Sequence, residues 1–149
     1  MKNILVFLFL AFWVTGFSQV YDSLPSEPEH YKARVARFQA EKVSSGKVIF
    51  LGNSITEGGK WRTLLKDSSV MNRGISGDNT FGVLARLDDV VRHKPSKVFL
   101  LIGVNDLSRR TPNSVVIENI FSIVGRIHEG SPETQVFVQS ILPVNSSHK

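Results

Sequence analysis

A serine shortly after an apolar segment is the first candidate nucleophile considered in this sequence. The segment Val48–Leu51 is apolar, Gly52 and Asn53 come next, and Ser54 follows them. A serine in such a turn either caps the next helix or attacks an electrophile once a base removes its proton. Thr56 stands where the Gly-x-Ser-x-Gly pattern of a nucleophile elbow requires its second glycine, so this fragment alone favours the cap.

Two more apolar segments end in small, polar, glycine-containing stretches. NRGISGDNT contains Gly74, and GVNDLSRR contains Asn105. Because the carboxyl ends of parallel strands meet at one edge of a sheet, we expect Ser54, Gly74 and Asn105 to lie together. A serine that attacks an ester creates an oxyanion, which preorganised donors such as backbone N–H groups and a neutral amide stabilise. Taken singly, Gly74 has a simpler role as a turn glycine, and Asn105 as a loop residue bonded to its own backbone.

The elements that must position these residues alternate between strand and helix. Apolar residues at three- and four-residue steps predict helices, and short apolar runs rich in β-branched and aromatic residues predict strands. The expected helices are Tyr31–Val43, Trp61–Leu65, Asn79–His93 and Pro112–Gly130, the last with Thr111 as its N-cap. The expected strands are Lys47–Leu51, Ser68–Gly74, Lys97–Gly103 and Thr134–Pro143. In the third helix, Phe81, Leu84, Leu87 and Val91 form the face expected to pack inward. This order predicts an α/β domain whose parallel sheet is covered by helices on both faces.

Taken together, the three strand ends resemble successive blocks of the SGNH, or GDSL-type, hydrolase family. GNSIT is similar to the block with the nucleophilic serine, NRGISGDNT to the block with the glycine, and GVND to the block with the asparagine. The resemblance runs from about Lys47 to Pro143, and SILPVN is similar to the acetylhydrolase-type members. It implies a three-layer α/β/α, flavodoxin-like, doubly wound sheet.

The resemblance also implies an esterase that hydrolyses carboxylic, above all acetyl, esters through an acyl-enzyme. Ser54 would be the nucleophile, and the oxyanion donors would be the N–H of Ser54, the N–H of Gly74 and the side-chain amide of Asn105. No metal and no organic cofactor is implied. Asp106 is expected to hold its loop by hydrogen bonds, and Asp78 and Asn79 are expected to be turn and cap residues.

The sequence departs from the family pattern at two points. Asn53 stands where the family has an aspartate before the serine, and no Asp-x-x-His block, the family's source of the general base, occurs in the 149 residues. His93 and His128 end helices that lead into strands, so we expect both to be solvated at the amino edge of the sheet. His30, before the first helix, and His148, beyond the last strand, lie in no matching motif. The general base is therefore unassigned, and the closing C-terminal elements of such a fold are expected to be missing.

The amino terminus reads as an export signal. Lys2 precedes an apolar run from Ile4 to Val14, followed by small residues, which predicts a signal peptide over residues 1–18 and a single domain over residues 19–149. The run is shorter than the ~20 residues that span a bilayer, so a membrane anchor is not expected. The expected location is the periplasm or the extracellular space. The chain has no cysteine, and its net charge of +5 comes from scattered Lys and Arg, which gives nucleic-acid binding little support.

Two other functions remain compatible with the sequence. One is a non-catalytic protein that binds carbohydrates or esters and keeps the oxyanion loops without a base. The other is a nucleotide-binding flavodoxin-like domain, although neither Gly-x-x-x-x-Gly-Lys-Ser/Thr nor Gly-x-Gly-x-x-Gly occurs.

Overall fold

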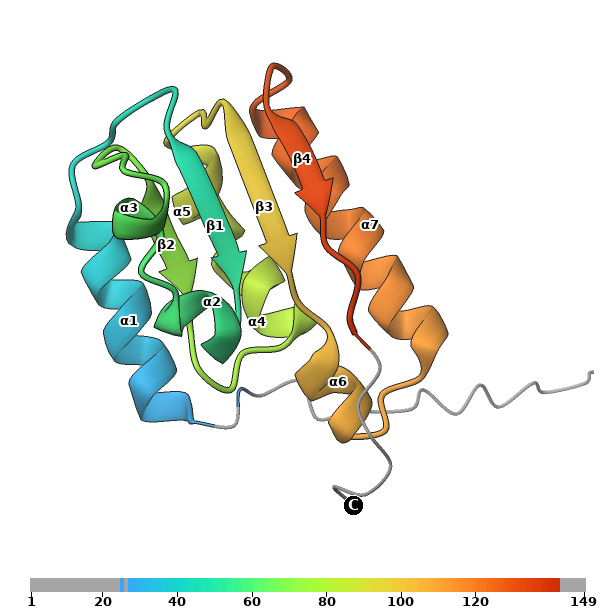
Figure 1. Cartoon of the computed structure of the whole chain (residues 1–149). Coiled ribbons are helices and arrows are strands. Elements are labelled where there is room, and N and C mark those ends of the chain that lie inside the picture. The colour runs from blue at the N-terminus through green and yellow to red at the C-terminus, as the bar shows by residue number, and fades with distance from the viewer. Residues whose placement is uncertain (1–24, 26, 143–149) are drawn as a thin grey trace, which may run out of the picture.

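A four-stranded parallel sheet forms the centre of the molecule (Figure 1). The computed structural model describes residue 25 and residues 27–142. The strands lie in the order β2-β1-β3-β4, so the chain starts in the middle of the sheet and extends it in both directions. Their bounds are β1 Val48–Gly52, β2 Met71–Gly74, β3 Lys97–Leu101 and β4 Gln135–Val138. The expected parallel α/β sheet is confirmed.

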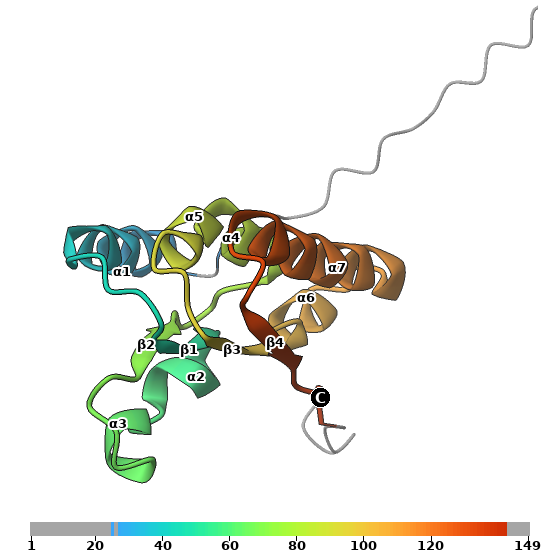
Figure 2. The same cartoon turned by 90° about the horizontal axis from the view of Figure 1, so that it is seen from above.

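Seven helices connect and cover the described strands. They are α1 Pro28–Ala40, α2 Ser54–Gly58, α3 Trp61–Leu64, α4 Thr80–Ala85, α5 Leu87–Val91, α6 Val104–Ser108 and α7 Asn113–Gly130. Helices α1, α4, α5 and α7 cover one face of the sheet, whereas α2 and α3 lie on the other (Figure 2). The fold is thus the three-layer arrangement expected from the sequence, with one layer much thinner than the other.

The core lies between the sheet and the thicker helical layer. Alternate residues of the central strands, such as Ile49, Leu51, Val98 and Leu100, have no exposed surface and pack on this side. The helices contribute Val83, Leu87, Val90, Ile123 and Ile127 to the same cluster. Burial of this apolar surface is the main force that holds the helices against the sheet.

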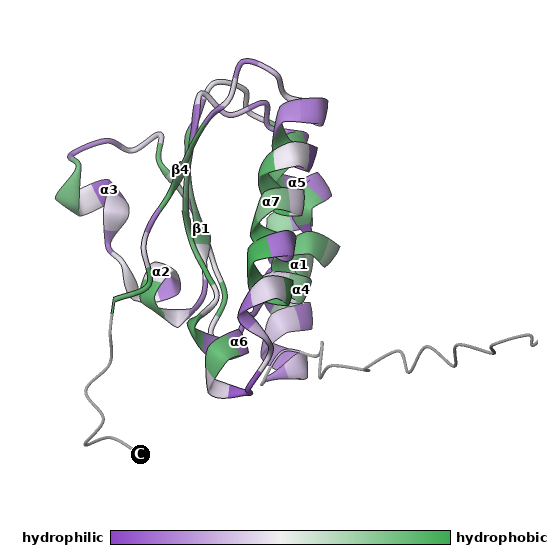
Figure 3. Ribbon diagram, turned by 90° about the vertical axis from the view of Figure 1, so that its right-hand side faces the viewer, coloured by the Kyte–Doolittle hydropathy of each residue, from purple (hydrophilic) through white to green (hydrophobic). Residues whose placement is uncertain are grey.

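The other face of the sheet carries a row of stacked aromatic rings. Phe50, Phe99 and Phe137 occupy matched positions on β1, β3 and β4, and neighbouring ring centroids lie 5.0 and 4.9 Å apart. Trp61 of α3 stacks on Phe50 at 4.1 Å. Coverage stops there, because α2 and α3, the helices on this face (Figure 3), lie near β1 and β2 and do not reach β4 (Figure 2), and 43% of Phe137 is exposed.

The predicted helix Asn79–His93 is wrong as a single helix. It breaks at Arg86, whose φ of −113° and ψ of 12° end α4 and begin α5. The predicted inward face is largely confirmed: Leu87 is buried and Leu84 and Val91 pack against the core, which Val83 and Val90 extend. Arg86 itself is buried, and its side chain forms an ion pair described below.

Smaller corrections concern the ends of the helices. Helix α1 begins at Pro28, ahead of the predicted Tyr31, and ends before Val43. Pro112 rather than Thr111 precedes α7, and Thr111 is buried with its N–H bonded to the carbonyl of Asp106.

The predicted signal peptide and the carboxyl-terminal residues from Pro143 onward lie outside the described residues. Within the described part of the chain, no helix combines the length and the apolar content needed to cross a bilayer.

Candidate active site

Ser54 is the first residue of α2, at the carboxyl end of β1, and its side chain is exposed. The capping role belongs to its neighbour, because Asn53 Oδ1 accepts a hydrogen bond from the N–H of Ile55 at 3.0 Å. Within the described residues, no hydrogen bond engages the Ser54 hydroxyl. The Ser54 hydroxyl is therefore free to contact a ligand, and Ser54 is not the N-cap of α2.

Gly74 ends β2 and is fully engaged by the protein. Its N–H donates to Asn72 Oδ1 at 2.8 Å, and its carbonyl accepts a hydrogen bond from Arg34 at 2.9 Å. A Cβ at this position would overlap the backbone of Thr56 and Glu57, so a glycine is required for α2 to pack against β2. The geometry does not support the expected role of Gly74 as an oxyanion donor.

A second glycine of the same block lies nearer to the predicted site. The N–H of Asp78 bonds to the carbonyl of Ile75 at 3.2 Å, which closes a turn with Gly77 at φ +73°. The amide of Asn105 donates to the carbonyl of Asp78 at 2.7 Å. The glycine beside the Asn105 amide is therefore Gly77. Sequence analysis missed it, although the turn signal Ser-Gly-Asp was available.

Asn105 lies in α6, just beyond β3, and neighbouring residues of the same segment fix its position. Gly103 adopts φ +115°, and a Cβ there would press on Ile141, so the chain can leave β3 in this direction only with glycine. Asp106 is buried and accepts hydrogen bonds from the N–H of Thr80 at 3.1 Å and from its hydroxyl at 2.5 Å. Burial raises the pKa of Asp106, and the bonds from Thr80 partly offset this. The expected loop-holding role of Asp106 is confirmed.

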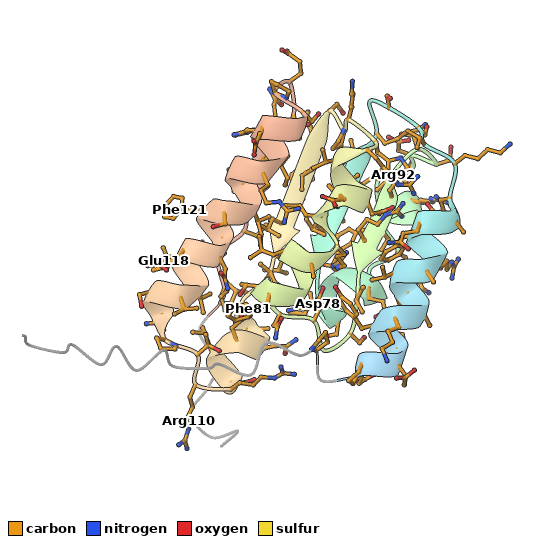
Figure 4. The ribbon with its side chains drawn as sticks, turned by 180° about the vertical axis from the view of Figure 1, so that it is seen from behind. Asp78, Phe81, Arg92, Arg110, Glu118 and Phe121 are labelled. Atoms are coloured by element: carbon orange, nitrogen blue, oxygen red, sulfur yellow. The ribbon has the colours of Figure 1, made fainter. Side chains whose placement is uncertain are left out.

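The block after β2 is anchored by a buried ion pair that the sequence analysis missed. Asp78, which Figure 4 labels inside the molecule, has no exposed surface and lies 2.8 Å from the Arg86 guanidinium. Burial raises the pKa of Asp78, while the charge of Arg86 lowers it in part. Arg86 also donates to the carbonyls of Gly52 and Arg73, so it joins the ends of β1 and β2. The expected cap role of Asn79 is confirmed, because its side chain accepts from the N–H of Gly82 at 2.8 Å.

Glu57, three residues after Ser54, connects α2 to the neighbouring loop and to α1. Its carboxylate accepts the N–H of Ser76 at 2.5 Å and lies 3.1 Å from His30 Nε2 and 3.3 Å from Arg34 Nε. Burial alone would raise the pKa of Glu57, but hydrogen bonds from Ser76 and His30 and the charge of Arg34 outweigh it and hold the pKa below its usual value. Glu57 therefore fixes α2 against the turn that contains Gly77.

None of the described histidines contacts Ser54. His93 has no exposed surface, and its Nδ1 accepts the N–H of Ser44 at 3.1 Å, so the prediction that it is solvated is wrong. Burial lowers the pKa of His93. His128 is exposed near the end of α7, as expected. His30 lies inside α1 rather than before it and is bonded to Glu57. His148 lies outside the described residues.

An apolar pocket of about 400 Å³ adjoins the serine. Chain neighbours of both candidate residues line it, since Asn53 and Ile55 flank Ser54, and Val104 precedes Asn105. Leu101, Ile102 and the segment 139–142 complete the wall. Its volume lies within the range of small-molecule sites. Within the described residues, no group of three or more acidic or histidine side chains is arranged to hold a metal ion.

Comparison with known proteins identifies the family. The profile of the GDSL-like lipase/acylhydrolase family matches residues 50–149. The chain belongs to this family. The matched GDSL-like region contains Ser54, both glycines of the second block and Asn105.

Relatives of the GDSL-like family resemble the chain in sequence and in fold. An arylesterase of Vibrio mimicus is 31% identical over 121 residues, which cover 71% of this chain and 60% of the relative. The platelet-activating factor acetylhydrolase IB subunit alpha1 of Bos taurus is 31% identical over 114 residues, which cover 72% of this chain and 48% of the relative. The chain thus spans about half to three fifths of the length of these relatives.

Solved structures support the GDSL-like fold. A putative platelet activating factor structure from Streptococcus pneumonia superposes with a TM-score of 0.68 at 28% identity and covers 79% of this chain and 57% of that one. A GDSL-like lipase from Bacteroides thetaiotaomicron superposes with a TM-score of 0.63 at 28% identity, with coverages of 76% and 58%.

Proposed function

We propose that the chain carries the nucleophile and oxyanion part of a serine esterase. The observation that carries this proposal is the pairing of an exposed, unbonded Ser54 hydroxyl with an Asn105 amide fixed on the adjacent loop. A side-chain amide has two N–H groups. One donates to the backbone carbonyl of Asp78 and sets the orientation of the amide, and the other remains to meet a developing oxyanion.

The reaction follows from these positions. The Ser54 oxygen attacks the ester carbonyl carbon and loses its proton to a base, and the carbonyl oxygen becomes an oxyanion stabilised by the Ser54 N–H and the Asn105 amide. Collapse of the intermediate releases the alcohol and leaves an acyl-enzyme, which water then hydrolyses. We assign the third donor to the turn at Gly77 instead of Gly74, because that turn lies beside Asn105.

The substrate is proposed to be an ester with a small acyl group, such as acetate. The sequence resemblance to acetylhydrolase-type members supports acetate, and so does the similarity to an acetylhydrolase subunit. The apolar pocket beside Ser54 would accept the acyl group, and its volume of about 400 Å³ leaves room for a chain longer than acetyl. We further propose that residues 1–18 direct export and that the esterase works outside the cytoplasm.

The test is hydrolysis of p-nitrophenyl esters by the purified protein beside Ser54→Ala. Acetate, butyrate and octanoate esters report the acyl preference. Rates that fall to the uncatalysed background in Ser54→Ala support the proposal, because the nucleophile of a serine esterase is indispensable. Equal rates in the two proteins would contradict it.

A second candidate is a non-catalytic protein that binds esters or carbohydrates. It is favoured by one observation: none of the described histidines contacts Ser54. Added imidazole separates the two candidates, since it can replace a missing base. A rate increase with imidazole that Ser54→Ala lacks would indicate an intact nucleophile without its base, whereas no Ser54-dependent rate under any condition would favour the binding protein.

A further inference from the structure

A second pocket, of about 380 Å³, lies along the outer edge of β2, between α1 and α3. We call it the β2-edge pocket. Its wall includes five basic side chains, Arg34, Arg37, Lys60, Arg62 and Arg73. It is separate from the apolar pocket beside Ser54, and no residue lines both.

The charges of the β2-edge pocket are not balanced. Two carboxylates line it, and both already have cationic partners: Glu41 lies 2.9 Å from Arg73, and Glu57 lies 3.3 Å from Arg34. Arg37, Lys60 and Arg62 form no ion pair within the described residues. The pocket therefore holds an excess of three positive charges, in a concave space that concentrates their field.

Several of the guanidinium groups are held in place before any ligand binds. Arg62 Nε donates to the carbonyl of Val70 at 2.9 Å, and one terminal nitrogen of Arg34 donates to the carbonyl of Gly74 at 2.9 Å. The guanidinium groups of Arg34 and Arg73 lie over the ring of the buried Phe38, with their Cζ atoms 4.8 and 4.5 Å from the ring centroid. Fixed guanidinium groups lose little conformational entropy when they bind an oxyanion.

One donor in this wall lacks an acceptor. Arg34 Nε is buried and makes no hydrogen bond, because the Glu57 carboxylate at 3.3 Å is poorly aligned with it. A buried donor without an acceptor is uncommon and costs free energy. Glu57 therefore satisfies the Arg34 guanidinium incompletely, and the positive charge of Arg34 can still attract an anion in the pocket.

We propose that the β2-edge pocket binds an oxyanion group, either a carboxylate or a phosphate. Arginine recognises both through paired N–H groups, and three cations without carboxylate partners are available to attract the negative charge of such a ligand. The site does not depend on esterase activity, because none of its cationic residues belongs to the proposed nucleophile or oxyanion machinery. It does adjoin that machinery, since Glu57 lines the pocket and lies in the same helix as Ser54.

The experiment is isothermal titration of the purified protein with inorganic phosphate and, separately, with galacturonate as a sugar carboxylate. The test variants are Arg37→Gln, Arg62→Gln and the double variant. The matched control is Lys32→Gln, an exposed residue of α1 that does not line the pocket. Circular dichroism verifies that every variant is folded.

We expect saturable binding that weakens about tenfold for each charge-assisted hydrogen bond removed, and no change in Lys32→Gln. Binding should also weaken between 50 and 200 mM salt, because exposed charges are screened over about 10 Å at these concentrations. Preference for phosphate or for galacturonate identifies the source of the anion. Absence of binding by both anions would overturn the proposal, and so would binding that the double variant leaves unchanged. Anion binding is measured without any ester substrate, so the anion-site proposal and the esterase proposal are tested independently of each other.

Discussion

Two glycines of one sequence block have different tasks, and the difference lies in what surrounds their backbones. Gly74 is where α2 packs against β2, and a side chain there would overlap the helix backbone. Gly77 lies in a tight turn with φ +73°, a conformation that an alanine adopts only with strain. The first glycine therefore serves packing, and the second serves the path of the chain past Asn105.

The first prediction separates these tasks. Gly74→Ala should destabilise the fold by at least about 3 kcal/mol, because backbone must shift to admit the methyl group. Gly77→Ala should cost only about 1–2 kcal/mol, the strain of one left-handed residue. Urea unfolding followed by circular dichroism measures both. A smaller loss for Gly74→Ala than for Gly77→Ala would show that the contact with α2 is not what requires glycine at position 74.

Asn105 gives the second prediction at the residue scale. Asn105→Ala removes a donor aimed at the oxyanion and should lower kcat on p-nitrophenyl acetate about 10²–10³-fold. Asn105→Asp should do no better, because an ionised carboxylate cannot donate and would face the carbonyl of Asp78. Both variants also lose the hydrogen bond to Asp78 and should be destabilised by about 1 kcal/mol or more, so kcat is compared at a temperature at which circular dichroism shows them folded. Activity that survives in Asn105→Asp would remove the amide from the proposed mechanism.

At the scale of elements, helix α1 ties together parts of the site that are far apart in sequence. His30 and Arg34 contact Glu57 of α2, and the hydroxyl of Tyr31 donates to the carbonyl of Gly82 in α4 at 2.6 Å. Burial, with the charge of Asp78 next, raises the pKa of Tyr31 to about 12. The helix that precedes the matched family region is therefore part of the scaffold of the site.

The Tyr31 contact predicts a dependence of stability on pH. Because the folded pKa of about 12 exceeds the unfolded value of 10.0, the stabilisation by Tyr31 is complete below pH 10 and is lost as pH rises toward 12. The difference in unfolding free energy between the native protein and Tyr31→Phe should be constant from pH 7 to 9 and should shrink above pH 10. Urea titrations at pH 8 and pH 11 measure it. A difference that grows at pH 11 would reverse the sign and contradict the buried hydroxyl.

The Asp78–Arg86 pair connects helices to strand ends and gives another prediction. Arg86→Leu leaves a buried carboxylate without its partner and should cost about 3–5 kcal/mol. The double variant Asp78→Asn with Arg86→Leu removes the unpaired charge as well, so it should recover part of that loss. Unfolding midpoints of the three proteins give the result. No recovery in the double variant would mean that the bonds from Arg86 to the strand carbonyls matter more than the ion pair.

These elements also explain which features the sequence could predict. Strands were predictable because buried parallel strands are short, continuous apolar runs, and the polar stretches after them located Ser54 and Asn105. The break at Arg86 was not, because the apolar residues keep helical spacing across it, so periodicity records no interruption there. The burial of His93 likewise depends on Ser44, 49 residues away in the chain. The sequence could not show whether Gly74 or Gly77 lies beside Asn105, because this depends on the path of the backbone.

For the molecule as a whole, the two faces of the sheet are unequally covered. The thick helical layer buries one face (Figure 3), while the row of stacked rings on the other face ends at Phe137 of β4, the strand that α2 and α3 do not reach (Figure 2). Within the described residues, β4 pairs only with β3, and 51% of Val138 is exposed. An apolar edge strand of this kind is a surface on which chains associate.

The last prediction is that association runs through this edge. We expect the purified protein to associate as its concentration rises and Phe137→Lys to abolish this association, because a charged side chain at the edge disfavours pairing with another chain. Phe121→Lys is the matched control: Phe121 is 72% exposed on the outer side of α7, away from the open face (Figure 4). Sedimentation velocity at several concentrations measures the masses. If both variants abolish association, exposed apolar side chains in general drive it. If neither variant abolishes association, the open face of the sheet is not the surface through which the chains associate, and Phe137 matters only for the stability of the single chain.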